Sequence, residues 1–379
     1  MFTGVLARSP LLWHKQKRGP QDVDDGVLDA FAGNVSGSTG GRKIQTQQEG
    51  VVMKIVVLDG YTLRAGTESP WPASGAADEW VCYDRTPADK VLERAAGADV
   101  LVVNKTVMDA ALMDALPSLR CIAVTAAGTN VIDSEAAGAR GIVVCNTPAY
   151  GTDAVAQHVF ALILELCRHT ALHDESVRRG DWTRCEDFCY ALTPQVELTG
   201  KTLGIFGFGN LGRRVAEIGH AFGMKVVACA HRPVPAPDYA PFAFVSREEL
   251  FRESDVLSLH CPLTEETRGL VCRETLALMK RGAFIINTSR GPVVRGKDVA
   301  EALREGRLGG FGADVLECEP PAMDDPLLSA PHSLITPHIA WMTDGARRNI
   351  VSITLENIRR FREGNPQNVV NRAFLKDRR

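Results

Sequence analysis

The sequence predicts an α/β protein of two domains, each built on a parallel sheet. At 379 residues the chain is longer than one hydrophobic core usually organises. Short apolar runs alternate with helical patterns over most of its length, as in parallel sheets whose strands are buried on both faces. A glycine-rich turn, Gly207-Phe208-Gly209-Asn210-Leu211-Gly212, joins one of these runs to the next helix and supports the same fold class.

The first domain is predicted from four strand-like runs. They are Lys54–Leu58, Val100–Asn104, Cys121–Val124 and Ile142–Asn146. A long helix follows, for which Thr152 is a plausible N-cap, and its apolar residues recur at the 3.6-residue period. These residues are Val155, Val159, Leu162, Ile163 and Leu166. We expect this helix to link the two domains and to carry His158, His169 and His173 at the surface or at an interface.

The second domain alternates more regularly. Its predicted strands are Leu203–Gly207, Val226–Ala230, Val256–His260 and Ala283–Thr288, with a helix at Asn210–Phe222. Ser246 and Glu249 have the spacing of a capping box before another helix. A closing amphipathic helix contains Ile350, Ile353, Leu355 and Ile358, and we expect it to pack back on the first domain.

The N-terminal 52 residues differ from the rest of the chain. Ala32 to Gly50 is rich in Gly, Ser, Thr and Gln and has almost no apolar periodicity, so it is predicted to be disordered. The basic first twenty residues weakly resemble a transit peptide but show no amphipathic helix. We favour a dispensable extension, or a translation start placed too far upstream.

Composition excludes several classes of protein. A net charge of -3 without a basic stripe gives no sign of nucleic-acid binding, and no apolar run reaches the ~18 residues of a membrane span. The ten cysteines are scattered singly, which favours free thiols in a reducing cytoplasm. Cys185 and Cys189 lack a second pair at zinc-ligand spacing, so no metal is predicted.

The glycine turn predicts a dinucleotide site. Gly207, Gly209 and Gly212 follow a strand and open a helix, so the backbone can approach a pyrophosphate and the helix N-terminus can donate N–H groups to it. The alternative is a merely tight strand-to-helix turn.

The end of the next strand bears on the choice between NAD and NADP. An NAD-specific enzyme places an acid there, but this chain has Ala230, followed by His231 and Arg232. Both side chains could pair with a 2'-phosphate, although they could equally be solvated loop residues. We predict that NADPH is used at least as well as NADH.

Three residues farther along match the needs of 2-keto acid reduction. Arg290 follows a strand directly, and its guanidinium can hold a carboxylate and stabilise negative charge on the keto oxygen. His338 can give that oxygen a proton. Glu319, if hydrogen-bonded to the imidazole, would fix its tautomer and favour its protonated form. The alternative for Arg290 is a structural salt bridge.

With these motifs the chain resembles the D-isomer-specific 2-hydroxyacid dehydrogenase family, in its glycerate dehydrogenase (hydroxypyruvate reductase) branch. The likeness runs from Met53 to about Asn371. Besides the glycine turn, it rests on Asp59-Gly60, Asn104-Lys105-Thr106, Ala127-Gly128-Thr129-Asn130, Val155-Ala156-Gln157-His158, Trp182, Asp187-Phe188-Cys189, His260-Cys261-Pro262-Leu263-Thr264 and Pro337-His338-Ile339-Ala340-Trp341.

The resemblance implies two Rossmann-like, doubly wound parallel-sheet domains with the active site in the cleft between them. Residues 53–152 plus 340–379 would form the substrate domain and residues 153–339 the dinucleotide-binding domain, after a disordered extension at 1–52. The catalytic residues would be Arg290, Glu319 and His338. A homodimer is also implied. The family has no counterpart of the extension.

The resemblance also implies the binding residues. Substrate would contact Arg290, Lys105 and the backbone of Ala127, Gly128 and Thr129. Cofactor contacts would come from Gly207, Gly209, Asn210, Leu211, Gly212, His231, Arg232, Cys261, Pro262, Thr267, Thr288, Ser289 and Asp314. The substrate would be a short 2-keto or D-2-hydroxy acid.

Two other functions are compatible with this fold. Formate-oxidising relatives pair the histidine with glutamine, so Glu319 argues against formate or phosphite oxidation. A nucleotide-sensing corepressor would share the fold and the three residues, but this chain ends soon after its closing helix.

Overall fold

The structure is a computed structural model that describes residues 52–64, 70–72 and 78–375. Except for Val52, the predicted extension at residues 1–52 lies outside the described residues. No helix in the described part of the chain is long and apolar enough to cross a membrane.

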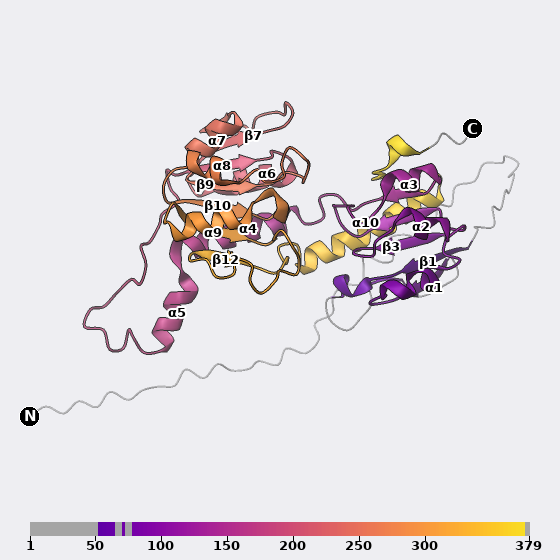
Figure 1. The fold of residues 1–379 in the computed structure, drawn as a ribbon, viewed down its shortest axis with the longest axis horizontal. Coiled ribbons are helices and arrows are strands. Elements are labelled where there is room, and N and C mark those ends of the chain that lie inside the picture. Colours follow the sequence, from indigo (N-terminus) through magenta and orange to yellow (C-terminus); the bar gives the residue numbers. More distant parts are fainter. Residues whose placement is uncertain (1–51, 65–69, 73–77, 376–379) are drawn as a thin grey trace, which may run out of the picture. The chain divides into compact units, whose positions relative to one another are not determined.

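The first sheet has five parallel strands in the order β2-β1-β3-β4-β5 (Figure 1). They are β1 (Met53–Val57), β2 (Asp78–Cys82), β3 (Val100–Val103), β4 (Cys121–Val124) and β5 (Val143–Cys145). Every residue of β3 and β4 is buried, because helices cover both faces of the sheet.

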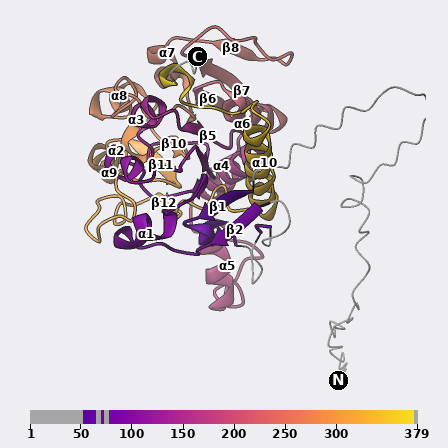
Figure 2. The same cartoon turned by 90° about the vertical axis from the view of Figure 1, so that its right-hand side faces the viewer.

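Different parts of the chain cover the two faces of this sheet. Apolar residues of α1 (Val91–Ala95), α2 (Ala110–Asp114) and α3 (Ser134–Ala139) pack on one face. On the other face, Ile350 and Ile358 of α10 (Asp344–Arg362) contact the cluster around Ile55 and Val102 (Figures 1 and 2). The prediction that the closing helix packs back on the first sheet is confirmed.

The second sheet has seven parallel strands in the order β12-β11-β10-β9-β6-β7-β8. They are β6 (Thr202–Phe206), β7 (Lys225–Cys229), β8 (Phe242–Phe244), β9 (Val256–Leu259), β10 (Ala283–Asn287), β11 (Leu308–Ala313) and β12 (Ser333–Ile335). Counted from β6, six of them follow the order 3-2-1-4-5-6 of the Rossmann fold. The strand order therefore reverses at β6, the strand that leads into the glycine turn.

Helices also lie on both faces of the second sheet. Residues of α7 (Arg247–Glu253), α8 (Arg273–Leu278) and α9 (Gly296–Arg304) pack on one face, and those of α4 (Thr152–Arg168) and α6 (Asn210–Ala221) on the other. The capping box that begins α7 is present, with Ser246 and Glu249 making both of its hydrogen bonds. The predicted fold class, two doubly wound α/β sheets, is confirmed.

Two details of the linking helix were predicted wrongly. Its N-cap is Gly151, and Thr152 is already helical, its hydroxyl donating to the Ala149 carbonyl at 3.3 Å. The helix also ends at Arg168, because His169 adopts a left-handed backbone (φ 46°). His173 therefore belongs to a separate helix, α5 (Thr170–Arg178).

Candidate active site

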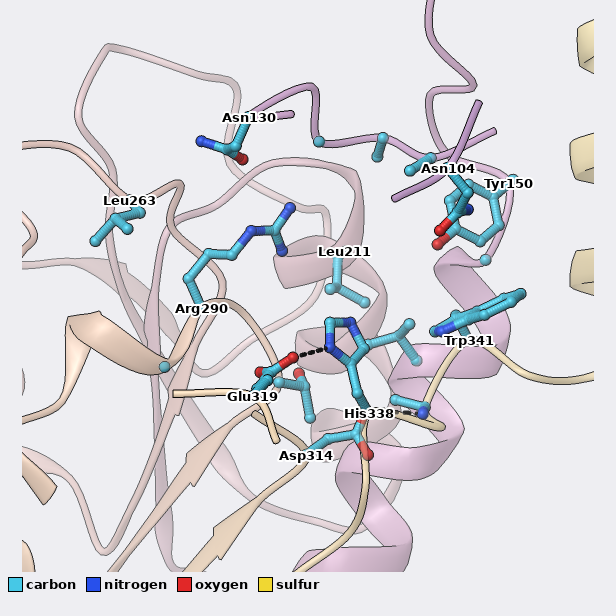
Figure 3. A pocket seen from close by; sticks show the side chains of 18 of the residues that line it. Asn104, Asn130, Tyr150, Leu211, Leu263, Arg290, Asp314, Glu319, His338 and Trp341 are labelled. Carbon is cyan, nitrogen blue, oxygen red and sulfur yellow. Dashed lines mark hydrogen bonds and ion pairs between the residues drawn. The ribbon is translucent and has the colours of Figure 1, made fainter. Parts of the chain in front are cut away.

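Polar side chains from both sheets meet at one cavity. Asn104 and Lys105 follow β3, Arg290 lies three residues after β10, and Asp314 follows β11 directly, while β12 leads to His338. All five line a cavity of about 610 Å³ (Figure 3). Parallel strands end on the same edge of a sheet, so residues far apart in sequence gather there.

His338 and Glu319 form a hydrogen-bonded pair in this cavity (Figure 3). The imidazole Nδ1 lies 2.6 Å from Glu319 Oε2, and the Leu316 N–H donates to the other carboxylate oxygen at 3.3 Å. Partial burial acts to raise the pKa of Glu319, but the hydrogen bond and charge of His338, the Leu316 N–H and the charge of Lys105 bring this pKa below its ordinary value. Glu319 is therefore ionised at neutral pH, and Nε2 of the imidazole remains available to another partner.

The backbone around His338 is held by Asp314. His338 has a left-handed conformation (φ 57°), which is unfavourable for a residue with a side chain. The two amides that follow it, those of Ile339 and Ala340, each donate to one oxygen of Asp314 at 2.8 Å. Asp314 is almost wholly buried and also accepts a 2.6 Å hydrogen bond from the Thr336 hydroxyl.

His158 was predicted to be a surface or interface residue, and this is wrong. Its side chain is 18% exposed, and its Nε2 lies 2.9 Å from the Thr336 hydroxyl and 3.6 Å from Asp314 Oδ1. His158 therefore contacts Thr336 and lies near Asp314, the residue that holds the backbone after His338.

Arg290 faces the same cavity from the end of β10 (Figure 3). Its Nη1 donates to the Ser289 carbonyl at 2.7 Å, and none of its nitrogens is within 4.0 Å of a carboxylate of the described residues. The guanidinium lies against Gly128, where a Cβ atom would collide with Nη2. The loop that bears Gly128 must therefore have glycine at this position if Arg290 is to keep its place.

The glycine turn between β6 and α6 fits a dinucleotide. Gly207 has a positive φ of 97°, and a Cβ there would lie 2.7 Å from the His260 carbonyl oxygen. A Cβ on Gly212 would collide with the Gly207 carbonyl. No atom lies within 4 Å of a Cβ built on Gly209, so the N-terminus of α6 is open to a ligand. Nearby, the Thr288 hydroxyl is buried and has no hydrogen-bond partner among the described residues.

The other predicted cofactor residues differ in their positions. Asn210 and Leu211 line the cavity together with Thr288, whereas Ser289 is buried and hydrogen-bonded to Asn287. Thr267 donates its hydroxyl to the Pro262 carbonyl at 2.7 Å, within the loop that begins at Cys261. His231 and Arg232 are exposed after β7, with His231 Nδ1 3.9 Å from Glu266.

Among the predicted substrate residues, Ala127, Gly128 and Lys105 line the cavity and Thr129 does not. The amides of Asn104, Lys105 and Thr106 all donate to the buried carboxylate of Asp59, at 2.6 to 2.8 Å, which fixes the backbone that bears Lys105.

Several residues of the cavity were not predicted. They are Asn104, Asn130, Tyr150, Glu317 and Trp341. Tyr150 and Trp341 pack edge to face, with ring centroids 6.3 Å apart. Burial raises the pKa of Tyr150 although the charge of Arg290 opposes this. Aromatic residues in loops carry no periodicity, so only the motif around His338 hinted at Trp341.

The Rossmann-type sheet, the open glycine turn and the His338–Glu319 pair define a dinucleotide-dependent oxidoreductase. Comparison with known proteins gives the family. The model of the D-isomer specific 2-hydroxyacid dehydrogenase NAD binding domain matches residues 160–340.

Relatives match a larger part of the chain. A hydroxypyruvate reductase of Blautia hydrogenotrophica is 41% identical over 323 residues, which is 84% of this chain and 100% of the relative. A glycerate dehydrogenase of Methylorubrum extorquens is 38% identical, covering 84% of this chain and 98% of its own. The solved NADPH-dependent glyoxylate/hydroxypyruvate reductase of Sinorhizobium meliloti, in complex with NADP and malonate, is 27% identical with a TM-score of 0.73, covering 86% of this chain and 99% of its own.

The chain therefore belongs to the D-isomer specific 2-hydroxyacid dehydrogenase family. It is an enzyme that transfers a hydride between NAD or NADP and a short 2-keto or 2-hydroxy acid. These comparisons give no support to the corepressor alternative.

Proposed function

We propose that Arg290, Glu319 and His338 carry out the reduction of hydroxypyruvate to D-glycerate or of glyoxylate to glycolate. The observation that carries this proposal is the 2.6 Å hydrogen bond from His338 to Glu319 in a cavity that Arg290 also lines. The names of the relatives support the choice of substrate, since they include hydroxypyruvate and glyoxylate reductases.

In the proposed mechanism, Arg290 holds the substrate carboxylate, together with Lys105 and the backbone of Ala127, Gly128 and Thr129. When bound, the nicotinamide cofactor supplies the hydride. Because Glu319 occupies Nδ1, His338 donates its proton from Nε2 to the keto oxygen. In the reverse direction the neutral ring accepts this proton from the hydroxyl. Arg290 also stabilises the negative charge that develops on the oxygen.

The cofactor is proposed to bind along the carboxyl edge of the second sheet. Its pyrophosphate would lie against Gly207, Gly209, Asn210, Leu211 and Gly212, where the N-terminus of α6 is open. Further contacts would come from Cys261, Pro262, Thr267, Thr288, Ser289 and Asp314. His231 and Arg232 would bind a 2'-phosphate, and the absence of an acid at Ala230 supports the use of NADPH.

An initial-rate panel tests the proposed substrates. Hydroxypyruvate, glyoxylate, pyruvate and phenylpyruvate are each assayed with NADH and with NADPH. We expect the highest kcat/KM for hydroxypyruvate or glyoxylate, because the relatives include reductases of these two acids. A preference for phenylpyruvate would overturn the choice of substrate while leaving the reaction type intact.

We also propose a homodimer. In α5 only Ser176 is buried, and the segment from α5 to Phe188 exposes large apolar side chains. These are Leu172, Val177, Trp182 and Phe188, the last 88% exposed. An exposed group of this kind is typical of an interface. Light scattering of the wild type and Phe188→Asp tests it: a wild-type monomer would contradict the proposal.

The division of the chain is proposed to be a substrate domain of residues 53–152 plus 340–379 and a dinucleotide-binding domain of residues 153–339. Limited proteolysis between the two sheets, around residues 147–152, tests these bounds. A reducing cytoplasm is proposed as the location, because five cysteines are buried as free thiols. Fractionation of the cells would test the location.

A further inference from the structure

A chain of side chains connects the linking helix to the catalytic turn. It runs from His158 of α4 to the Thr336 hydroxyl at 2.9 Å and from there to Asp314 at 2.6 Å. Asp314 in turn holds the amides of Ile339 and Ala340, directly after His338. His158 itself is not among the residues that line the cavity.

The hydrogen atoms in this chain have a defined direction. A threonine hydroxyl has one proton to donate, and Thr336 Oγ1 lies closer to Asp314 Oδ1, at 2.6 Å, than to the Ala313 carbonyl, at 3.4 Å. With that proton given to Asp314, the hydroxyl can only accept from His158. The imidazole of His158 therefore has its proton on Nε2 and donates to Thr336.

The catalytic turn needs such support because its conformation is unfavourable. A non-glycine residue in a left-handed conformation persists only where surrounding contacts hold it. The N–H of His338 donates to the Thr336 carbonyl at 3.0 Å. The next two amides, those of Ile339 and Ala340, donate to Asp314. His158 lies between Ala156 and Val159, which are both fully buried, so α4 gives the imidazole a fixed position.

We propose that His158 is a positioning residue for His338: its Nε2–H orients Thr336, Thr336 orients Asp314, and Asp314 sets the turn that aims the His338 imidazole. This role rests on the proposed function, in which His338 transfers the proton. His158 contacts neither substrate nor reacting atoms. Its contribution is therefore to kcat rather than to the binding of the acid.

The test compares two variants at each position with a control on the same helix. His158→Leu removes the donor at similar volume, whereas His158→Gln retains an N–H donor. Thr336→Val removes the hydroxyl, and Thr336→Ser retains it. Gln157→Ala is the control, since Gln157 is exposed one residue earlier on α4.

We expect His158→Leu and Thr336→Val each to lower kcat about 10- to 100-fold, as small displacements of a catalytic group do, with KM for the keto acid nearly unchanged. His158→Gln, Thr336→Ser and Gln157→Ala should retain most of the activity. Since both residues act through one chain of hydrogen bonds, kcat of the double variant His158→Leu/Thr336→Val should be no lower than that of the less active single variant. Full kcat in His158→Leu would overturn the proposal, as would a loss in His158→Gln equal to that in His158→Leu.

A second readout needs no turnover. The proton between His338 and Glu319 should give a downfield proton NMR signal in the free enzyme, identified by its absence in Glu319→Gln. We expect this signal to weaken in His158→Leu and to persist in His158→Gln. An unchanged signal in His158→Leu would contradict the inference. Full activity of His338→Ala would instead overturn the proposed function, so the two failures are distinguishable.

Discussion

At the scale of single residues, His338 is constrained from two sides. Glu319 holds its ring through Nδ1, while Asp314 holds the backbone that follows it. The first contact occupies Nδ1 and leaves Nε2 available, and the second sets the direction of the ring. Both are needed if the imidazole is to give a proton to an oxygen that Arg290 polarises.

Replacing Glu319 tests the first contact. The pKa of Glu319 lies below its ordinary value, so the carboxylate is charged throughout the physiological range and stabilises an imidazolium. In Glu319→Gln this charge is lost, so the decline of the reduction rate at alkaline pH should begin at a lower pH. The rise of the oxidation rate should move in the same direction. A pH–rate profile that coincides with that of the wild type would show that the two residues are not coupled.

Replacing Arg232 tests the proposed cofactor preference. A guanidinium paired with a 2'-phosphate contributes about 1.5 to 3 kcal/mol, and the lower figure already corresponds to about tenfold in affinity. Arg232→Ala should therefore weaken NADPH by about tenfold or more and leave NADH unaffected, as measured by kcat/KM with each cofactor. If the wild type strongly prefers NADH and the substitution changes neither value, Arg232 is only a solvated loop residue.

Some of these residues could be predicted from the sequence and others could not. Arg290, Glu319 and His338 lie near strand ends in an order that fits one reaction, so the chemistry predicted their meeting. His158 was misplaced because histidine is polar and was assigned to the surface. Its spacing of three residues from Val155 and four from Leu162 places it on the buried face of the helix, a signal that was present but not used.

At the scale of elements, most strands of the two sheets were predicted, whereas β2, β8 and β11 were missed. β11 has the sequence Leu-Gly-Gly-Phe-Gly-Ala, whose glycines are typical of turns. In the structure a Cβ on Gly310 or Gly312 would lie about 3 Å from Leu166 or Leu162 of α4, so the glycines allow the helix to approach the strand. Local sequence does not reveal this, because the reason lies in a partner almost 150 residues away.

An element-scale prediction concerns His260, at the end of β9. Burial lowers the pKa of this histidine from its ordinary value of 6.5 to about 3. Between these values the unfolded chain binds a proton that the native state cannot, so the residue destabilises the protein as pH falls below 6.5. The free energy of unfolding then decreases by about 1 kcal/mol for each pH unit of acidification. His260→Asn should therefore show a free energy of unfolding that declines less steeply between pH 6 and about 4 than that of the wild type. Parallel curves in urea titrations at several pH values would contradict this.

At the scale of the whole molecule, we predict that the two sheets and the helices that cover them suffice for activity. The Blautia relative is matched over its full length by 84% of this chain. A protein that begins at Met53 should therefore keep the thermal stability and the kcat of the full chain, because residues 1–52 lack the apolar area to form a core. Loss of folding on this truncation, measured by calorimetry, would show that the extension is structural.

In the proposed mechanism, His338 transfers the proton in the reduction of a short 2-keto acid. The most direct measurement compares wild type and His338→Ala in the reduction of hydroxypyruvate, with cofactor affinity determined separately by fluorescence titration. Because general acid catalysis contributes about 10²- to 10⁴-fold, kcat should fall by this factor while the Kd of the cofactor stays nearly the same. Turnover by His338→Ala close to that of the wild type would remove His338 from the mechanism.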